Sequence, residues 1–80
     1  MKYYAVIAGQ DAGADILDNK GYMTLDKARD ALKEAYDAAL ASHAPEEIIY
    51  SAYSEDLAEF SLDTEVRYYF ETTELAIEED

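Results

Sequence analysis

The segment TLDKARDALKEAYDAALA, residues 24–41, decides the fold because it predicts one long amphipathic helix. Thr24 is a candidate N-cap, and Asp26 places a carboxylate at the positive end of the helix dipole. Pro45 stops the helix, since it restricts the residue before it and cannot continue the helical hydrogen bonding. The apolar positions recur at helical spacing and form one stripe: Leu25, Ala28, Leu32, Ala35, Tyr36, Ala39 and Leu40.

Segments on both sides of this helix are rich in β-branched and aromatic residues and predict strands. Residues 2–8 (KYYAVIA) are apolar nearly throughout, which indicates a central strand covered on both faces. Residues 47–53 (EIIYSAY) predict a second long strand. Residues 65–72 (EVRYYFET) alternate between apolar and polar side chains, the pattern of a half-buried strand.

Three shorter segments leave alternatives open. Residues 14–17 are a candidate short strand, residues 54–60 indicate either a helix start or a lead into a short strand over 58–62, and residues 74–78 (ELAIE) indicate either an edge strand or a helical turn. We therefore expect a single compact α+β domain over residues 1–80. Its mostly antiparallel sheet has three to four strands, and one long α-helix packs on one face.

The charge of the chain is divided unevenly along its length. Residues 1–40 carry seven acidic and five basic residues, whereas residues 41–80 carry twelve acidic residues and a single base, Arg67. The total of −13 disfavours binding to nucleic acid or to anionic lipid, because both are polyanions. Half of the residues are hydrophobic, so the acidic half does not indicate a disordered tail. A folded acidic face predicts a partner with a basic surface.

The acidic residues of the second half are the candidate partner-binding groups. Alternate residues on one strand face lie about 6.5–7 Å apart, which is comparable with the spacing of phosphates along a nucleic-acid strand. A row of carboxylates on a sheet face or in a loop can therefore imitate a phosphate backbone. The alternative is a solvated surface, although solubility needs a net charge of only about 2–8. The candidates are Glu55, Asp56, Glu59, Asp63, Glu65, Glu71, Glu74, Glu78 and Glu79, together with Tyr69.

Eight tyrosines accompany these acids, and there is no tryptophan. Tyrosine is enriched in protein interfaces, and arginine both pairs with carboxylates and stacks on rings. Tyr53 and Tyr69 lie beside carboxylates in the sequence and are the interface candidates. Tyr36, Tyr50 and Tyr68 are expected to be half-buried core residues.

Catalytic and metal chemistry finds little support in the sequence. Asp11, Asp15 and Asp18 supply oxygen ligands in a turn-rich loop, but the calcium-loop pattern is absent, so we predict no metal site. His43 is the single histidine, and its expected role is a favourable interaction with the helix dipole. No phosphate-binding glycine loop or nucleophile set occurs. We expect no enzymatic activity and no cofactor.

No signal peptide or transmembrane segment is recognisable in the sequence, and there is no cysteine, which fits a reducing cytoplasm. We also expect a monomer, because a charge of −13 opposes self-association at low salt.

A short, strongly acidic chain without cysteine that places one helix against a small sheet resembles the phage-encoded inhibitors of bacterial defence, namely anti-CRISPR proteins and anti-restriction DNA mimics. The resemblance lies in composition and layout. It implies an inhibitor that binds the DNA-engaging surface of a CRISPR effector or restriction enzyme in the bacterial cytoplasm and blocks DNA binding. Acidic adaptors, antitoxins and nuclease-immunity proteins share this charge profile and remain the alternative, as does a small domain whose acidity serves only solvation.

Overall fold

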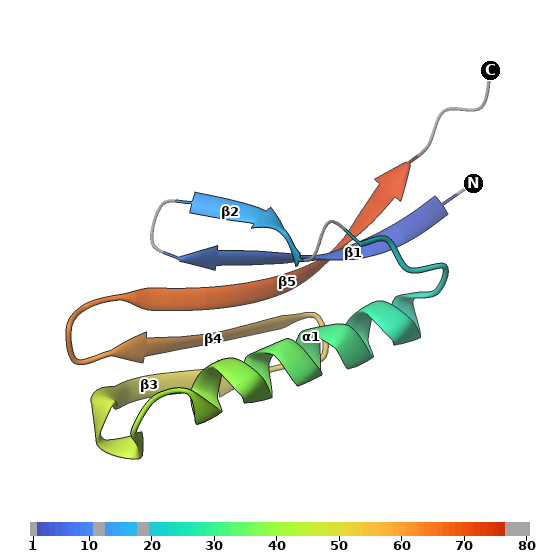
Figure 1. Cartoon of the computed structure of the whole chain (residues 1–80). Helices are drawn as coiled ribbons and strands as arrows, with labels where there is room; N and C mark the ends of the chain where they lie inside the picture. The colour runs from blue at the N-terminus through green and yellow to red at the C-terminus, as the bar shows by residue number, and fades with distance from the viewer. Residues whose placement is uncertain (1, 11–12, 18–19, 77–80) are drawn as a thin grey trace.

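The computed structural model describes residues 2–10, 13–17 and 20–76. These residues form a five-stranded antiparallel sheet with one long helix against one face (Figure 1). The strand order is β2-β1-β5-β4-β3. The elements are β1 (Lys2–Gln10), β2 (Gly13–Ile16), α1 (Leu25–Ala41), the 3-10 helix η2 (Pro45–Glu47), β3 (Ile48–Tyr53), β4 (Leu57–Leu62) and β5 (Arg67–Ala76).

The expected two-layer α+β architecture is confirmed, but the sheet has five strands where three to four were predicted. Two of the open alternatives resolve as strands, because Gly13–Ile16 pairs with β1 and Leu57–Leu62 pairs with both β3 and β5. Residues 67–72 of one predicted segment and 74–76 of the other share one strand, β5, and residues 77 and 78 lie outside the described residues. All four residues of β2 are exposed, so the strand shows no alternation of buried and exposed side chains. It is recognised as a strand by its backbone pairing with β1.

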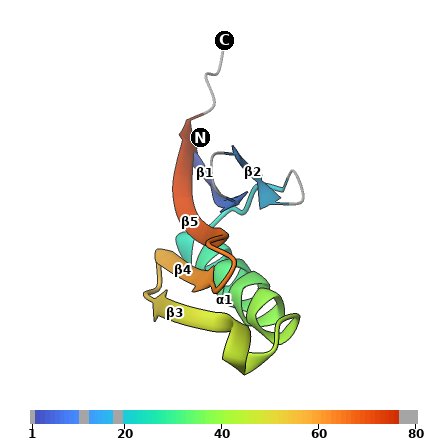
Figure 2. The ribbon, with the colours of Figure 1, turned by 90° about the vertical axis from the view of Figure 1, so that its left-hand side faces the viewer.

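The helix forms where its local signals place it. Thr24 has an extended backbone, and its side chain accepts a hydrogen bond of 3.2 Å from the backbone N–H of Lys27, as an N-cap residue should. The apolar stripe buries Ala28, Leu32 and Tyr36 against the sheet. Figure 2 shows the helix on one side of the sheet only, so the opposite side is not covered by α1.

The hydrophobic core lies between α1 and the three middle strands. Val6, Leu32 and Phe60 are its largest fully buried side chains. The rings of Phe60 and Tyr68 stack with centroids 5.0 Å apart. Tyr36 is buried among them, and its hydroxyl donates a 3.2 Å hydrogen bond to the backbone oxygen of Glu59. Burial raises the pKa of Tyr36 above its ordinary value.

Strand β1 has the central position predicted for it, between β2 and β5. Ala5 and Val6 point to opposite faces of the sheet, and both are fully buried.

Tyr50 is a correction to the sequence analysis, because it is 52% exposed and does not belong to the core. Ile48 pairs with Leu62 and packs against the core, so regular alternation would turn Tyr50 toward the helix as well. A bulge between these two residues instead pairs Tyr50 with Ser61 and turns its side chain to the opposite face.

The turn between β4 and β5 holds a strained residue. The backbone N–H of Glu65 donates to the carbonyl of Leu62 at 3.0 Å, and the N–H of Leu62 donates to the carbonyl of Val66 at 2.9 Å. Glu65 has a φ of 72°, the left-handed conformation that this hairpin turn normally gives to glycine. A non-glycine residue pays about 1–2 kcal/mol for that conformation.

Replacing Glu65 with glycine is therefore expected to raise the free energy of unfolding by about 1 kcal/mol in urea denaturation followed by circular dichroism. Glu65→Ala is the matched control, because it removes the same charge and keeps a Cβ atom at the strained position. An equal gain in both variants would assign the effect to charge and contradict the backbone explanation.

Candidate functional site

The face of the sheet opposite α1, here called the open face, carries polar and aromatic side chains together. Phe60, Tyr68 and Phe70 point toward the helix, so their neighbours along β4 and β5 point away from it. On β3, β4 and β5 the large and charged side chains of the open face include Tyr50, Leu57, Glu59, Arg67, Tyr69 and Glu71.

Arg67 neutralises the centre of the open face. Its Nε donates to Oε2 of Glu59 at 3.1 Å, and its second amino group contacts the same oxygen. The guanidinium also lies 5.6 Å from the centroid of the Tyr69 ring. Glu71 is exposed and has no ion-pair partner among the described residues. The open face therefore presents a mixture of groups and not a continuous row of carboxylates.

Tyr69, an interface candidate from the sequence, lies across Gly9 of the neighbouring strand. The two residues are paired in the register of β1 and β5, and a Cβ atom on Gly9 would lie 2.6 Å from the Tyr69 hydroxyl oxygen. The ring is half-buried as a result. Tyr53, the other candidate, is 48% exposed and stacks on Tyr36 with ring centroids 5.8 Å apart.

Asp56 is held in a network that joins the helix to the sheet. Nε and Nη2 of Arg29 donate to its two carboxylate oxygens at 2.9 Å each, and the Thr72 hydroxyl donates to Oδ1 at 2.8 Å. Glu55 lies 3.7 Å from the same guanidinium, and Asp26 lies 3.9 Å from it. These hydrogen bonds, first from Arg29 and then from Thr72, lower the pKa of Asp56 below its ordinary value. Asp56 thus has a structural role, and its partner Arg29 was not predicted from the sequence.

This network predicts a pH-dependent contribution to stability. Because the pKa of Asp56 is lower in the folded chain than in the unfolded chain, its contribution is complete well above the ordinary pKa of 3.8. The contribution is lost as the pH falls below 3.8 and through the lowered folded pKa. Asp56→Asn should therefore cost stability at neutral pH and cost progressively less in acid. The measurement is the difference in unfolding free energy between wild type and variant, since acid also relieves repulsion among the other carboxylates.

Glu71→Gln is the control for this prediction, because Glu71 is exposed and lacks an ion-pair partner in the described part of the chain. A difference for Asp56→Asn that stays constant from pH 7 to pH 2 would contradict the role given to the Arg29–Asp56 pair.

Four acidic residues lie on two neighbouring segments at one end of the sheet, and we call this group the acidic end: Glu46, Glu47, Asp63 and Glu65. The backbone N–H of Asp63 donates to the carbonyl of Glu47 at 2.8 Å, which joins η2 to the turn between β4 and β5. Figure 1 shows this turn and η2 at the same end of the molecule. Nδ1 of His43 lies 3.7 Å from Oε2 of Glu47. Among the described residues, no lysine or arginine pairs with any of the four.

Asp63 and Glu65 are among the candidates predicted from the sequence, whereas Glu46 and Glu47 are not. The signal for these two was the PEE sequence directly after the helix stop, which continues the acidic run of the second half. The ring of His43, the residue expected to interact with the helix dipole, lies 5.8 Å from the ring of Phe60 and 5.7 Å from that of Tyr68.

The remaining candidates are scattered. Glu74 is exposed on β5, where it pairs in register with Tyr4. Glu78 and Glu79 lie outside the described residues, as do Asp11 and Asp18 of the considered calcium loop; Asp15 is exposed on β2. Within the described part of the chain, no group of three or more His, Cys, Asp or Glu residues is arranged to hold a metal ion. None of the described helices is long and apolar enough to cross a membrane.

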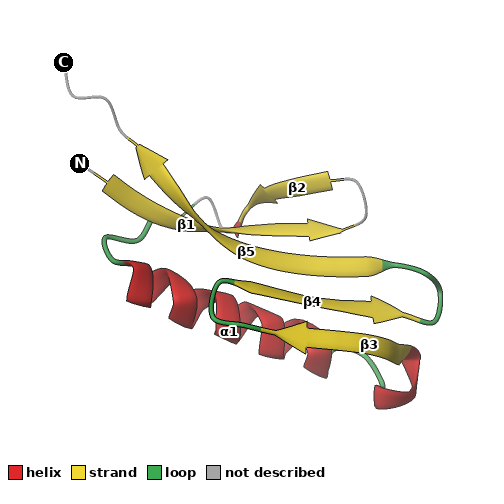
Figure 3. Cartoon of the chain, turned by 180° about the vertical axis from the view of Figure 1, so that it is seen from behind, coloured by secondary structure: helices red, strands yellow, loops and turns green. Residues whose placement is uncertain are grey.

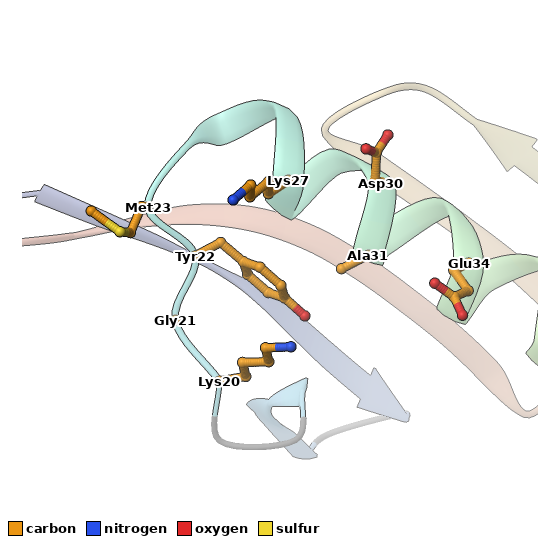
Figure 4. Close-up of a pocket in the computed structure, with 8 residues that line it drawn as sticks. All are labelled: Lys20, Gly21, Tyr22, Met23, Lys27, Asp30, Ala31 and Glu34. Atoms are coloured by element: carbon orange, nitrogen blue, oxygen red, sulfur yellow. The ribbon is translucent and has the colours of Figure 1, made fainter.

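A hollow beside the start of the helix holds two of the basic residues (Figure 4). The Lys20 ammonium lies 5.2 Å from the centroid of the Tyr22 ring, and Lys27 extends from the first turn of α1 toward the same region. Asp30 and Glu34 line the hollow as well, and the Asp30 carboxylate points away from the two lysines. The lining of this hollow contains no histidine, serine or cysteine.

No protein-family model matches the chain, and the comparisons with curated proteins and with solved structures find no match either.

Proposed function

We propose that this chain is an inhibitor that binds a positively charged, nucleic-acid-binding surface of a bacterial defence complex, such as a CRISPR effector or a restriction enzyme, and blocks DNA binding there. The acidic end is the observation that carries the proposal. Its carboxylates come from two separate segments, and no described lysine or arginine pairs with them. Like charges concentrated at one end of a folded chain destabilise it, and a cationic partner offsets this repulsion when it binds.

The chemistry of such a surface suits carboxylates in loops. Lysine and arginine side chains that bind phosphates by charge also bind carboxylates, and the bound counterions are then released to solution. The two central acids of the predicted set, Asp56 and Glu59, are already paired with Arg29 and Arg67. The proposed contact therefore runs through the acidic end and Glu71, and the whole acidic set does not act as one row.

An acidic adaptor, antitoxin or nuclease-immunity protein is the second candidate function, and the open face favours it. Tyr50 and Leu57 are 52% and 48% exposed. A phosphate-binding groove offers little apolar surface to such side chains, whereas protein interfaces are enriched in exposed tyrosine. In this alternative the partner is basic but its contact with the chain does not overlap its DNA site.

The test is capture from bacterial lysate with the immobilised chain, elution by a salt gradient, and parallel competition by double-stranded DNA. We expect a nucleic-acid-binding complex that salt elutes and DNA displaces. The double variant Glu46→Lys with Asp63→Lys should weaken capture about tenfold or more, since it reverses two charges of the acidic end.

Asp30→Lys with Glu34→Lys is the matched control, because it makes the same change in net charge on the outer surface of α1. Equal weakening by both pairs would mean that net charge, and not the acidic end, governs binding. A captured partner that DNA leaves bound supports the adaptor alternative. Absence of any partner at low salt would leave the charge with a solvation role alone.

A further inference from the structure

Strand β3 is the last strand in the order β2-β1-β5-β4-β3 and therefore forms one edge of the sheet (Figure 3). Among the described residues it pairs only with β4, so one of its two edges is open. The sequence IIYSAY contains no charged residue and no proline, the two features with which natural sheets usually block pairing at an edge. Ile49, Tyr50 and Tyr53 are 66%, 52% and 48% exposed. An open, uncharged and partly apolar edge of this kind accepts another strand.

The hydrogen-bonding pattern identifies which backbone groups face outward. The N–H of Ser54 donates to the carbonyl of Leu57 at 2.8 Å, so these two residues form a hydrogen-bonded pair. Such pairs recur at every second residue of an antiparallel ladder, and Ala52 with Glu59 is the next one. The N–H and C=O groups of Ser51 and Tyr53 therefore point away from β4 and toward the open edge.

Carboxylates stand at both ends of this uncharged strand. Glu46 and Glu47 of the acidic end precede it, and Glu55 and Asp56 follow it. Arg29 compensates the second group in part, since it pairs with Asp56 and lies near Glu55. The six-residue strand between the two acidic groups spans about 20 Å when fully extended.

A second copy of the chain is a poor occupant of this edge. Antiparallel pairing of two β3 strands would place Glu46 and Glu47 of one copy near Glu55 and Asp56 of the other. Parallel pairing would place identical acidic groups side by side. Like charges opposed in either way destabilise the pairing. An extended segment with an uncharged centre and basic residues at both ends meets the opposite charge at each end.

We propose that the open edge of β3 accepts such a segment of the basic partner as a sixth strand. Backbone hydrogen bonds to Ser51 and Tyr53 supply affinity, and the flanking carboxylates select for lysine or arginine at the ends of the segment. The inference rests on the proposed function to the extent that the partner is basic. The acidic end carries more uncompensated charge than the turn with Glu55 and Asp56, so the basic residues at that end contribute more.

The probe for this proposal is the synthetic peptide acetyl-Lys-Lys-Val-Thr-Val-Thr-Val-Lys-Lys-amide, titrated into the full chain and followed by amide NMR. We expect chemical-shift changes concentrated on β3 and slower hydrogen exchange at the amides of Ser51 and Tyr53. Ser51→Pro removes an outward N–H and leaves the ladder to β4 intact, so binding should be lost. Ser51→Ala removes only the hydroxyl, keeps that N–H and should bind as the wild type does.

Glu46→Lys is a second variant, because this exposed residue lies outside the sheet and its replacement does not disturb the strand. It should weaken binding of the lysine-flanked peptide about threefold or more. Wild-type-like binding by a folded Ser51→Pro variant would overturn the proposal. Equal binding of the same peptide with glutamate in place of lysine would overturn the stated partner chemistry.

Shift changes confined to the acidic end, with no protection on β3, would overturn strand addition while leaving the proposed function standing. A wild-type dimer in analytical ultracentrifugation that Ser51→Pro converts to a monomer would assign the edge to a second copy and also overturn the proposal. Because DNA plays no part in this test, failure of DNA competition in the lysate experiment is a separate result.

Discussion

Replacing Phe60 with alanine is expected to lower the free energy of unfolding by about 3–5 kcal/mol. Phe60 is fully buried on β4, and its ring contacts Tyr36, Tyr68 and His43 at centroid distances of 6.0, 5.0 and 5.8 Å. Truncation removes the transfer free energy of the ring and leaves a cavity that these rings cannot close completely. For a domain of 80 residues, whose total stability is about 4–12 kcal/mol, this is a large fraction.

Urea denaturation followed by circular dichroism measures the effect, with Phe60→Leu as the conservative comparison at a cost of about 1.5 kcal/mol or less. Tyr50→Ala is the surface comparison, since Tyr50 is 52% exposed, and should cost clearly less than Phe60→Ala. A Phe60→Ala variant no less stable than Tyr50→Ala would mean that the core is not organised around β4 as described.

The helix could be predicted nearly to the residue because all of its signals are local. The cap at Thr24, the stripe through Leu32 and Tyr36, and the stop near Pro45 lie within a few residues of the boundaries that they set. Strand β5 shows the limit of local patterns. Its apolar alternation changes phase between Phe70 and Leu75, which made one strand resemble two elements.

Long-range pairing explains why β5 continues through the change of phase. Strand β1 pairs with it from Gly9 opposite Tyr69 to Tyr3 opposite Leu75, so the hydrogen-bonded ladder is unbroken there. The helix-facing side carries Phe70, whereas Tyr3 and Leu75 are both half-buried on the other side. The buried face therefore differs between the two ends of the strand, and periodicity in one strand cannot reveal that.

The acidic character of the candidate site could be predicted from the sequence, but the ion pairs that neutralise some of its carboxylates could not. The acidic excess of residues 41–80 is a property of composition alone. Which acids are neutralised depends on contacts between distant residues, as between Arg29 and Asp56, or on cross-strand register, as between Arg67 and Glu59. The neighbourhood of Glu47 and Asp63 likewise depends on β3 pairing with β4.

Replacing Gly9 with alanine is expected to cost about 1–3 kcal/mol of unfolding free energy, although strand propensity alone favours alanine over glycine. The new Cβ atom would lie 2.5 Å from Cε1 of Tyr69 and 2.6 Å from its hydroxyl oxygen, well inside van der Waals contact. The ring must leave its position over the β1 backbone, and it would also lose its approach to the Arg67 guanidinium. Thermal and urea unfolding measure the loss.

The cause can be isolated by a double-mutant cycle with Tyr69→Ala. If the clash with the ring is the origin of the cost, Gly9→Ala should be neutral or slightly stabilising in the Tyr69→Ala background, because the three atoms nearest to the new Cβ all belong to that ring. The two substitutions would be strongly coupled. Additive losses would show that the backbone of β1 itself resists a side chain at Gly9, and a neutral single variant would show that the Tyr69 ring swings aside without loss. The second result would remove Tyr69 from the fixed structure of the open face and return it to the set of side chains available to a partner.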